Sequence, residues 1–210
     1  MALTPAQERA MIFEGFREEP YLDKLGYPTI GIGERLEDIQ YTKEQGVPYH
    51  LQNERRTREE AVQKLQEHWG ALEEDVSSRY GEGWSDLPQD VRDVVMDLSY
   101  NMGAEGLFTK FPGFLEDVQA GNYQSAAQNL KYKDPAAGDN PANYSDWWNQ
   151  VGGATTETNE NTGEWAGDAR AANRATANFD ILMNQPISED LMVENTMKQN
   201  DALNDAFGTA

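Results

Sequence analysis

The chain contains no cysteine and only two histidines among its 210 residues. Without cysteine the protein forms neither disulfide bonds nor thiolate metal sites, which fits synthesis in a reducing compartment. A zinc-dependent amidase or peptidase usually draws on several His, Cys or Asp ligands, whereas His50 and His68 are far apart in different contexts. We interpret both histidines as surface or structural residues, and we expect neither a metal nor another cofactor.

Basic residues are scarce, with 17 Lys and Arg against 37 Asp and Glu and a formal net charge of -20. Proteins that bind nucleic acid neutralise phosphates with clustered Lys and Arg, so this charge argues against nucleic acid as a partner. No apolar run approaches the ~20 residues that span a bilayer. The N-terminus, Met-Ala-Leu-Thr-Pro, leads into a capped helix without a signal-peptide core, so we expect no secretion by a signal of its own.

Apolar residues make up 38% of the chain, which is enough for a substantial core in one domain or two small lobes. Thr57 opens a capping box. Apolar residues then recur at helical spacing up to about residue 80, at Ala61, Leu65, Trp69, Leu72 and Val76. A second helix opens at residues 86–88, and we expect it to be the most buried one. Its apolar stripe is Val91, Val94, Val95, Leu98 and Met102.

The stretch from residue 14 to residue 33 brings together groups that are suited to catalysis. Glu14 ends a predicted helix, which Thr4 caps, Pro5 starts and Gln7 completes as a Thr-x-x-Gln capping box. The Glu14 carboxyl adjoins the apolar face at the helix C-terminus, where the macrodipole disfavours a second negative charge. A carboxyl that keeps its proton in this way suits a general acid.

Asp23 and Thr29 follow on two extended pieces, which we expect to form a hairpin through residues 24–28. The turn is Gly-rich and open to water, so Asp23 should stay ionised while Glu14 holds a proton. One acid, one base and a hydroxyl group would then surround a single turn. An ordinary hairpin that is flanked by a surface Glu and a surface Asp is the alternative interpretation.

This spacing, Glu-x8-Asp-x5-Thr followed by Ile-Gly-Ile-Gly, resembles the phage-type lysozymes, the muramidases of glycoside hydrolase family 24. The resemblance covers about residues 5–184, strongly in the first third and loosely in the last. It implies that Glu14 protonates the leaving oxygen, and that Asp23 and Thr29 hold and activate a water, without a cofactor. The family commonly has a His after Gly-Ile-Gly, whereas this chain has Glu34 there.

The resemblance also implies the fold class, which is α+β and mainly α. We expect a lysozyme-like two-lobed fold in residues 1–185, with a small β-hairpin lobe at about 14–56 and a larger helical lobe at about 84–185. A long helix at about 58–80 would join the two lobes. Residues 186–210 lie outside the resemblance, and their apolar spacing predicts an acidic helical extension.

Candidate substrate-binding residues come from looser matches. The Tyr100-Asn101-Met102-Gly103 segment is similar to the family's Phe-Asn-x-Gly, in which the Asn faces the cleft, although Asn101 could equally cap its helix. Asn129 resembles a substrate-contacting Asn by position, with a solvated helical Asn as the alternative. Arg170 falls where the family has a basic residue close to the catalytic Glu, and Arg174 is the second candidate. We expect residues 131–164 to form a long loop that contains one short helix. We interpret the Trp pair in this segment as a packing anchor rather than a platform for sugar.

The implied partner is bacterial peptidoglycan, cleaved between N-acetylmuramic acid and N-acetylglucosamine. Three roles compete. The first is a free, monomeric endolysin made in the host cytoplasm and acting on the wall in the periplasm. The second is a virion-borne lysozyme docked to a tail component, and the third is a lysozyme fold kept as a structural module. The charge of -20 gives no long-range attraction to an anionic wall.

Overall fold

The computed structural model describes residues 3–23, 25–151 and 174–186. Its α-helices are Pro5–Glu14 (α1), Arg58–Tyr80 (α2), Gln89–Met102 (α3), Ala104–Lys110 (α4), Pro112–Gln119 (α5), Tyr123–Lys131 (α6), Asp146–Gln150 (α7) and Arg174–Met183 (α8). Its strands are Arg17–Leu22 (β1), Pro28–Gly31 (β2) and Glu34–Arg35 (β3). A mainly helical chain with one small sheet confirms the predicted α+β class.

The predicted capping boxes set the starts of α1 and α2. The Gln7 backbone N–H donates to Oγ1 of Thr4 (3.3 Å), and the Thr4 N–H donates to Oε1 of Gln7 (3.0 Å). Thr57 and Glu60 exchange the same pair of bonds, at 3.2 and 2.9 Å. Each box satisfies two N–H groups that lack a partner within the helix, which is why both helices begin where the sequence indicates.

The sheet has the order β1-β2-β3 with antiparallel neighbours. Tyr21 of β1 lies opposite Thr29 of β2, and Arg17 lies opposite Gly31, with an irregularity between the two pairs. Thr29 also pairs with Arg35 of β3. The predicted hairpin therefore forms, and a short third strand, which the sequence did not indicate, extends it.

Helix α3 is the centre of the larger lobe, as its apolar stripe predicts. It packs against α1, α2, α4 and α8. Its buried apolar residues are Val91, Val94, Val95, Met96 and Leu98. The same helix also buries three polar side chains, those of Asp93, Asp97 and Ser99, so its interior face is not uniformly apolar.

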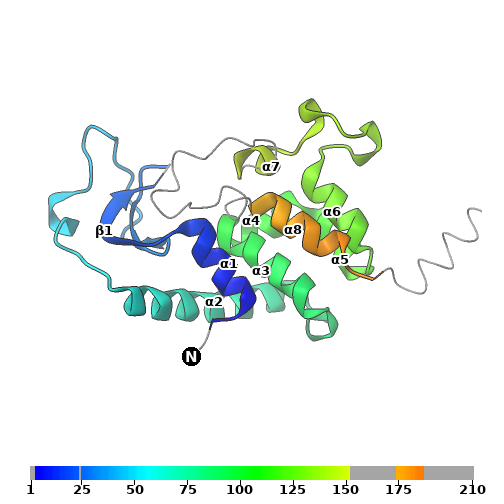
Figure 1. Ribbon diagram of the computed structural model, residues 1–210, viewed down its shortest axis with the longest axis horizontal. Helices are drawn as coiled ribbons and strands as arrows, with labels where there is room; N and C mark the ends of the chain where they lie inside the picture. Colours follow the sequence, from blue (N-terminus) through cyan, green and yellow to red (C-terminus); the bar gives the residue numbers. More distant parts are fainter. Residues whose placement is uncertain (1–2, 24, 152–173, 187–210) are drawn as a thin grey trace, which may run out of the picture.

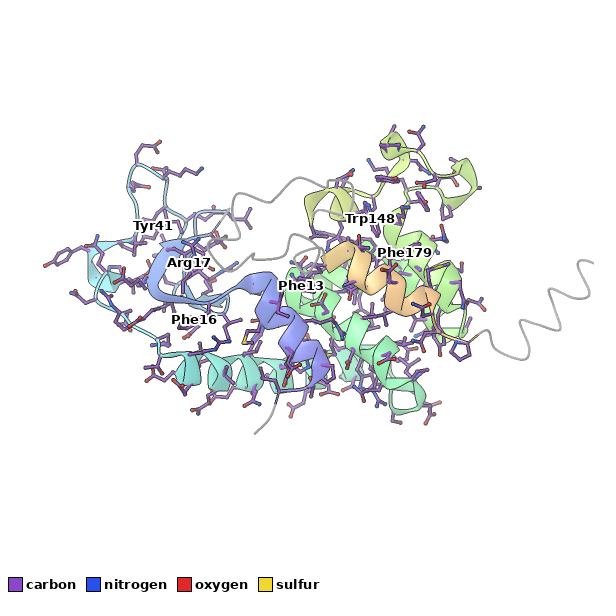
Figure 2. All side chains as sticks on the ribbon, in the orientation of Figure 1. Phe13, Phe16, Arg17, Tyr41, Trp148 and Phe179 are labelled. Atoms are coloured by element: carbon purple, nitrogen blue, oxygen red, sulfur yellow. The ribbon has the colours of Figure 1, made fainter. Side chains whose placement is uncertain are left out.

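Helix α2 links the two lobes. It runs along the lower edge of Figure 1, from the side of the sheet lobe toward the helical lobe, and buries one face over its whole length. The Trp pair sits in α7, where both rings are buried. Trp148 packs edge-on against Phe179 of α8, with ring centroids 5.6 Å apart (Figure 2), which agrees with a packing role.

Some predictions concern residues 152–173 and 187–210, which the structure does not describe. The predicted helix within 186–210 and the loop after residue 151 lie outside the described residues, and the bounds of the two lobes stay predictions. Among the residues that are described, no helix is both long enough and apolar enough to cross a membrane.

Candidate active site

Glu14 is the last residue of α1, and Gly15 caps the helix by donating its N–H to the Met11 carbonyl (3.0 Å). Its side chain is only 26% exposed. A Cβ on Gly33 would lie 3.5 Å from Oε2 of Glu14 and 3.7 Å from the Tyr100 hydroxyl, so the backbone after β2 passes close to both groups. The carboxyl is thereby enclosed between the start of the small lobe and α3.

Arg174, at the start of α8, is the basic residue that contacts Glu14 in the described parts of the chain. Its Nη2 donates to Oε1 of Glu14 (2.8 Å), and its Nε lies 3.3 Å from Oδ2 of Asp97. Burial alone would lower the pKa of Arg174, but the Asp97 and Glu14 carboxylates outweigh it and raise that pKa. Arg174 therefore holds its charge inside the protein. Arg170, the first candidate for this position, lies outside the described residues.

Asp23 follows β1 at the hairpin turn, and backbone groups fix its carboxyl. Oδ1 accepts from the N–H groups of Leu25 (2.9 Å) and Tyr27 (2.8 Å), while the Asp23 N–H donates to the Tyr27 carbonyl (2.9 Å). The turn itself rests on residue 41, because the Tyr41 N–H donates to the Gly26 carbonyl (2.8 Å). The side chain of Asp23 is held in place by its own turn.

Thr29 lies on β2 with only 4% of its surface exposed. Its Oγ1 donates to the Tyr27 carbonyl (3.0 Å), so the hydroxyl hydrogen is already used within the hairpin. Toward any further partner the Thr29 oxygen can only accept. A water beside it must therefore donate one of its hydrogens to this oxygen.

Two tyrosines lie beside these carboxyl groups. Burial, and after it the charge of Glu14, raises the pKa of Tyr21 to about 12, and Asp23 adds to the shift. Tyr21 is thus near both carboxyls. Burial and the charge of Glu14 also raise the pKa of Tyr100, whose hydroxyl donates to the Ile32 carbonyl (2.9 Å). Both phenols are neutral at any physiological pH. Tyr100 was a sequence candidate, whereas Tyr21 was missed because only the strand register brings it here.

A hollow of about 650 Å³ begins at Glu14 and extends between β3 and α2, and this size suits a ligand site. Its lining includes Gly33, Glu34, Lys64, His68 and Tyr100. Glu34, which replaces the family's His, makes a two-pronged bond to Arg56 with both N–O distances at 2.9 Å. The His68 ring packs edge-on against Tyr100, with centroids 5.4 Å apart.

The two predicted asparagines do not line this hollow. Oδ1 of Asn101 accepts from Nε1 of Trp147 (3.0 Å), a bond that ties α3 to α7. Nδ2 of Asn129 donates to Oδ2 of Asp117 (2.6 Å), which joins α6 to α5. Both side chains have structural partners in this arrangement, and their contact with substrate stays a prediction.

No three His, Asp or Glu side chains within the described parts of the chain are grouped so as to hold a metal ion. The groups near Glu14 include carboxyl, hydroxyl and guanidinium groups, and Lys64 and His68 line the same hollow. A carboxyl beside a hollow of ligand-binding size, with a second carboxyl on the neighbouring hairpin, is typical of glycoside hydrolases. Glu14 lines the hollow, whereas Asp23 and Thr29 do not.

The comparison with known families agrees with this class. The chain matches the family model described as Phage lysozyme over residues 11–143, which is more than half of its length. The chain belongs to the phage lysozyme family, and it is accordingly a glycoside hydrolase that acts on bacterial peptidoglycan. No curated protein matches it.

The turn that holds Asp23 generates a stability prediction. Gly26 has φ +89°, and a Cβ there would overlap the Tyr41 carbonyl oxygen, whereas Gly46 has φ +65° and open space around it. Gly26→Ala should lower the free energy of unfolding by about 2 to 5 kcal/mol, from the left-handed backbone and the overlap together. Gly46→Ala should cost only the backbone part, about 1 to 2 kcal/mol.

Urea unfolding followed by circular dichroism measures both variants. Equal losses at the two glycines would contradict the close packing of the Asp23 turn on Tyr41.

Proposed function

We propose that this protein is an N-acetylmuramidase that hydrolyses the β-1,4 bond between N-acetylmuramic acid and N-acetylglucosamine with inversion. The observation that carries the proposal is that Glu14 lines the hollow, while Glu14 and Asp23 both lie near enough to Tyr21 to raise its pKa. The hollow that starts at Glu14 supplies space for the glycan chain. One carboxyl can then act as acid and the other as base.

In the proposed reaction, Glu14 gives its proton to the glycosidic oxygen while the bond from that oxygen to the anomeric carbon breaks. Glu14 becomes a carboxylate in this step. The guanidinium of Arg174, 2.8 Å away, stabilises the negative charge that appears there. Tyr21 and Tyr100 stay neutral and add no competing charge.

The attacking water lies between Asp23 and Thr29 in this proposal. Both groups accept hydrogen bonds, because Asp23 is a carboxylate and the Thr29 hydrogen is bound to Tyr27. The water donates one hydrogen to each of them, which leaves an oxygen lone pair for the anomeric carbon. Asp23 takes the proton as the new bond forms. Room for this water implies carboxyl groups roughly 6.5 to 9.5 Å apart.

A test of the acid role is Glu14→Gln, which keeps the shape and removes the transferable proton. Wall clearing should fall by about 10² to 10⁴-fold, the usual contribution of general acid catalysis. Turbidity of a peptidoglycan suspension measures the loss, and the control is Glu8→Gln, an exposed change on the same helix. Equal clearing by Glu14→Gln and the parent protein would refute an enzymatic role for this site.

The role of Asp23 and Thr29 predicts the stereochemistry. A water that attacks opposite the leaving group inverts the anomeric carbon, so NMR of the first-formed product should show the α-anomer. Products should carry new reducing ends on muramic acid. A β-anomer would assign Asp23 as a nucleophile instead, and anhydro sugars would indicate a lytic transglycosylase.

For the biological role we propose a phage endolysin that is free and monomeric, made in the host cytoplasm and acting on the wall from the periplasmic side. The alternative is a virion lysozyme docked to a tail component through its acidic surface or residues 186–210. A purely structural module is disfavoured because Glu14, Asp23 and Thr29 are all present in the sequence. Mass spectrometry of purified particles should find no fixed copy number of this chain, and a fixed number would favour the virion role.

A further inference from the structure

A cluster of buried polar groups lies behind Glu14, where α1, α3 and α8 meet. Asp97 of α3 and Asn178 of α8 are 0% exposed, and Arg174 is 5% exposed. Asp97 takes part in none of the proposed catalytic steps. A buried carboxylate is expensive to keep unless a partner stabilises it, so its presence in the core calls for a physical reason.

The guanidinium of Arg174 has a carboxyl at each end. Nη2 is 2.8 Å from Oε1 of Glu14, and Nε is 3.3 Å from Oδ2 of Asp97, which also accepts from Nδ2 of Asn178 (2.7 Å). Within the described residues, Nε of Arg174 and Oδ1 of Asp97 have no aligned hydrogen-bond partner. The link between Asp97 and Arg174 is therefore mainly the attraction of opposite charges.

The charges around Arg174 explain how Asp97 affects the protonation of Glu14. If Arg174 had Glu14 as its sole partner, a protonated Glu14 would leave a buried guanidinium without a counter-ion, and this is strongly unfavourable. With Asp97 ionised, the pair of Arg174 and Asp97 is neutral by itself. Glu14 can then hold its proton without leaving Arg174 unpaired.

We propose that Asp97 is a positioning residue that shares the guanidinium of Arg174 with Glu14, so that Glu14 can carry the proton it delivers to the glycosidic oxygen. Asn178 supports this arrangement, because its amide donates to the Asp97 oxygen that faces Arg174. This inference rests on the proposed role of Glu14 as the general acid.

Other charged and titratable groups face the pair from each neighbouring element. Glu14 has Tyr21 on β1 and Tyr100 on α3 near it, both neutral, and Asp23 also acts on Tyr21. On the other side, burial and the charge of Glu14 raise the pKa of Asp97, while Arg174, Asn178 and Arg9 of α1 oppose this rise. The contribution of Asp97 therefore has to be isolated by substitution.

The experiment uses Asp97→Asn, which keeps the shape and an oxygen for Arg174 but removes the charge. In protein labelled with ¹³C at glutamate carboxyls, the Glu14 signal is assigned by its loss in Glu14→Gln. Its titration midpoint should fall by about one pH unit in Asp97→Asn, because the field of Arg174 on Glu14 is no longer offset. The alkaline limb of the pH profile of kcat should move down equally, with KM unchanged.

The matched control is Asp93→Asn, one turn earlier on α3. Asp93 is 5% exposed and pairs instead with Arg9 (3.8 Å) and Gln89 (2.7 Å), so its loss should leave the Glu14 midpoint unchanged. An unchanged midpoint in Asp97→Asn, or the same fall in both variants, would overturn the proposal.

A second variant covers the case in which Asp97→Asn does not fold. Asn178→Ser retains Asp97 but shortens the donor that holds the Asp97 pKa down, so Asp97 should lose part of its charge and the midpoint of Glu14 should fall by a smaller amount. No fall would again overturn the charge sharing. The NMR titration needs no substrate, so a parent protein that shows the expected midpoints but releases no sugar would refute the muramidase proposal and leave the shared guanidinium standing.

Discussion

One guanidinium group joins three helices that are far apart along the chain. Arg174 sits at the start of α8 and reaches Glu14 at the end of α1 and Asp97 in the middle of α3. It also lies over the Phe13 ring, 5.1 Å from its centroid, so an apolar surface covers the charge. Because an unpaired buried cation is strongly unfavourable, these contacts require α8 to dock with one particular placement against α1 and α3.

The other half of the site is built in a different way. Asp23 and Thr29 take their positions from hydrogen bonds within a single hairpin, and that hairpin rests on Tyr41 and on the Glu34–Arg56 pair. The bonds within the hairpin span two and four residues, and the Glu34–Arg56 pair that supports it spans 22. The position of Asp23 and Thr29 is thus fixed by contacts much shorter in sequence than the contact of Glu14 with Arg174, which spans 160 residues.

This difference explains what could be predicted from the sequence. Capping residues, apolar spacing and a Gly-rich turn act over a few residues, and they predicted α1, α2, α3, the hairpin, and the family that Glu14, Asp23 and Thr29 indicate. The third strand and Tyr21 depended on pairing register, and Asp97 on long-range packing. The one available signal for Asp97 was a charged residue directly beside the apolar stripe of α3, four residues after Asp93. The matched positions of Asn101 and Asn129 did not reveal their partners Trp147 and Asp117, and the contact of both asparagines with substrate stays a prediction.

Because α8 comes late in the chain, Arg174 reaches Glu14 and Asp97 only late during synthesis. A ribosome releases Glu14, the hairpin and α3 well before Arg174 leaves the exit tunnel. Until Arg174 emerges, the nascent chain holds Glu14 and Asp97 without the guanidinium that contacts both carboxyls in the folded protein. A nascent chain can therefore carry the whole N-terminal motif of the family while one group of its site is still missing.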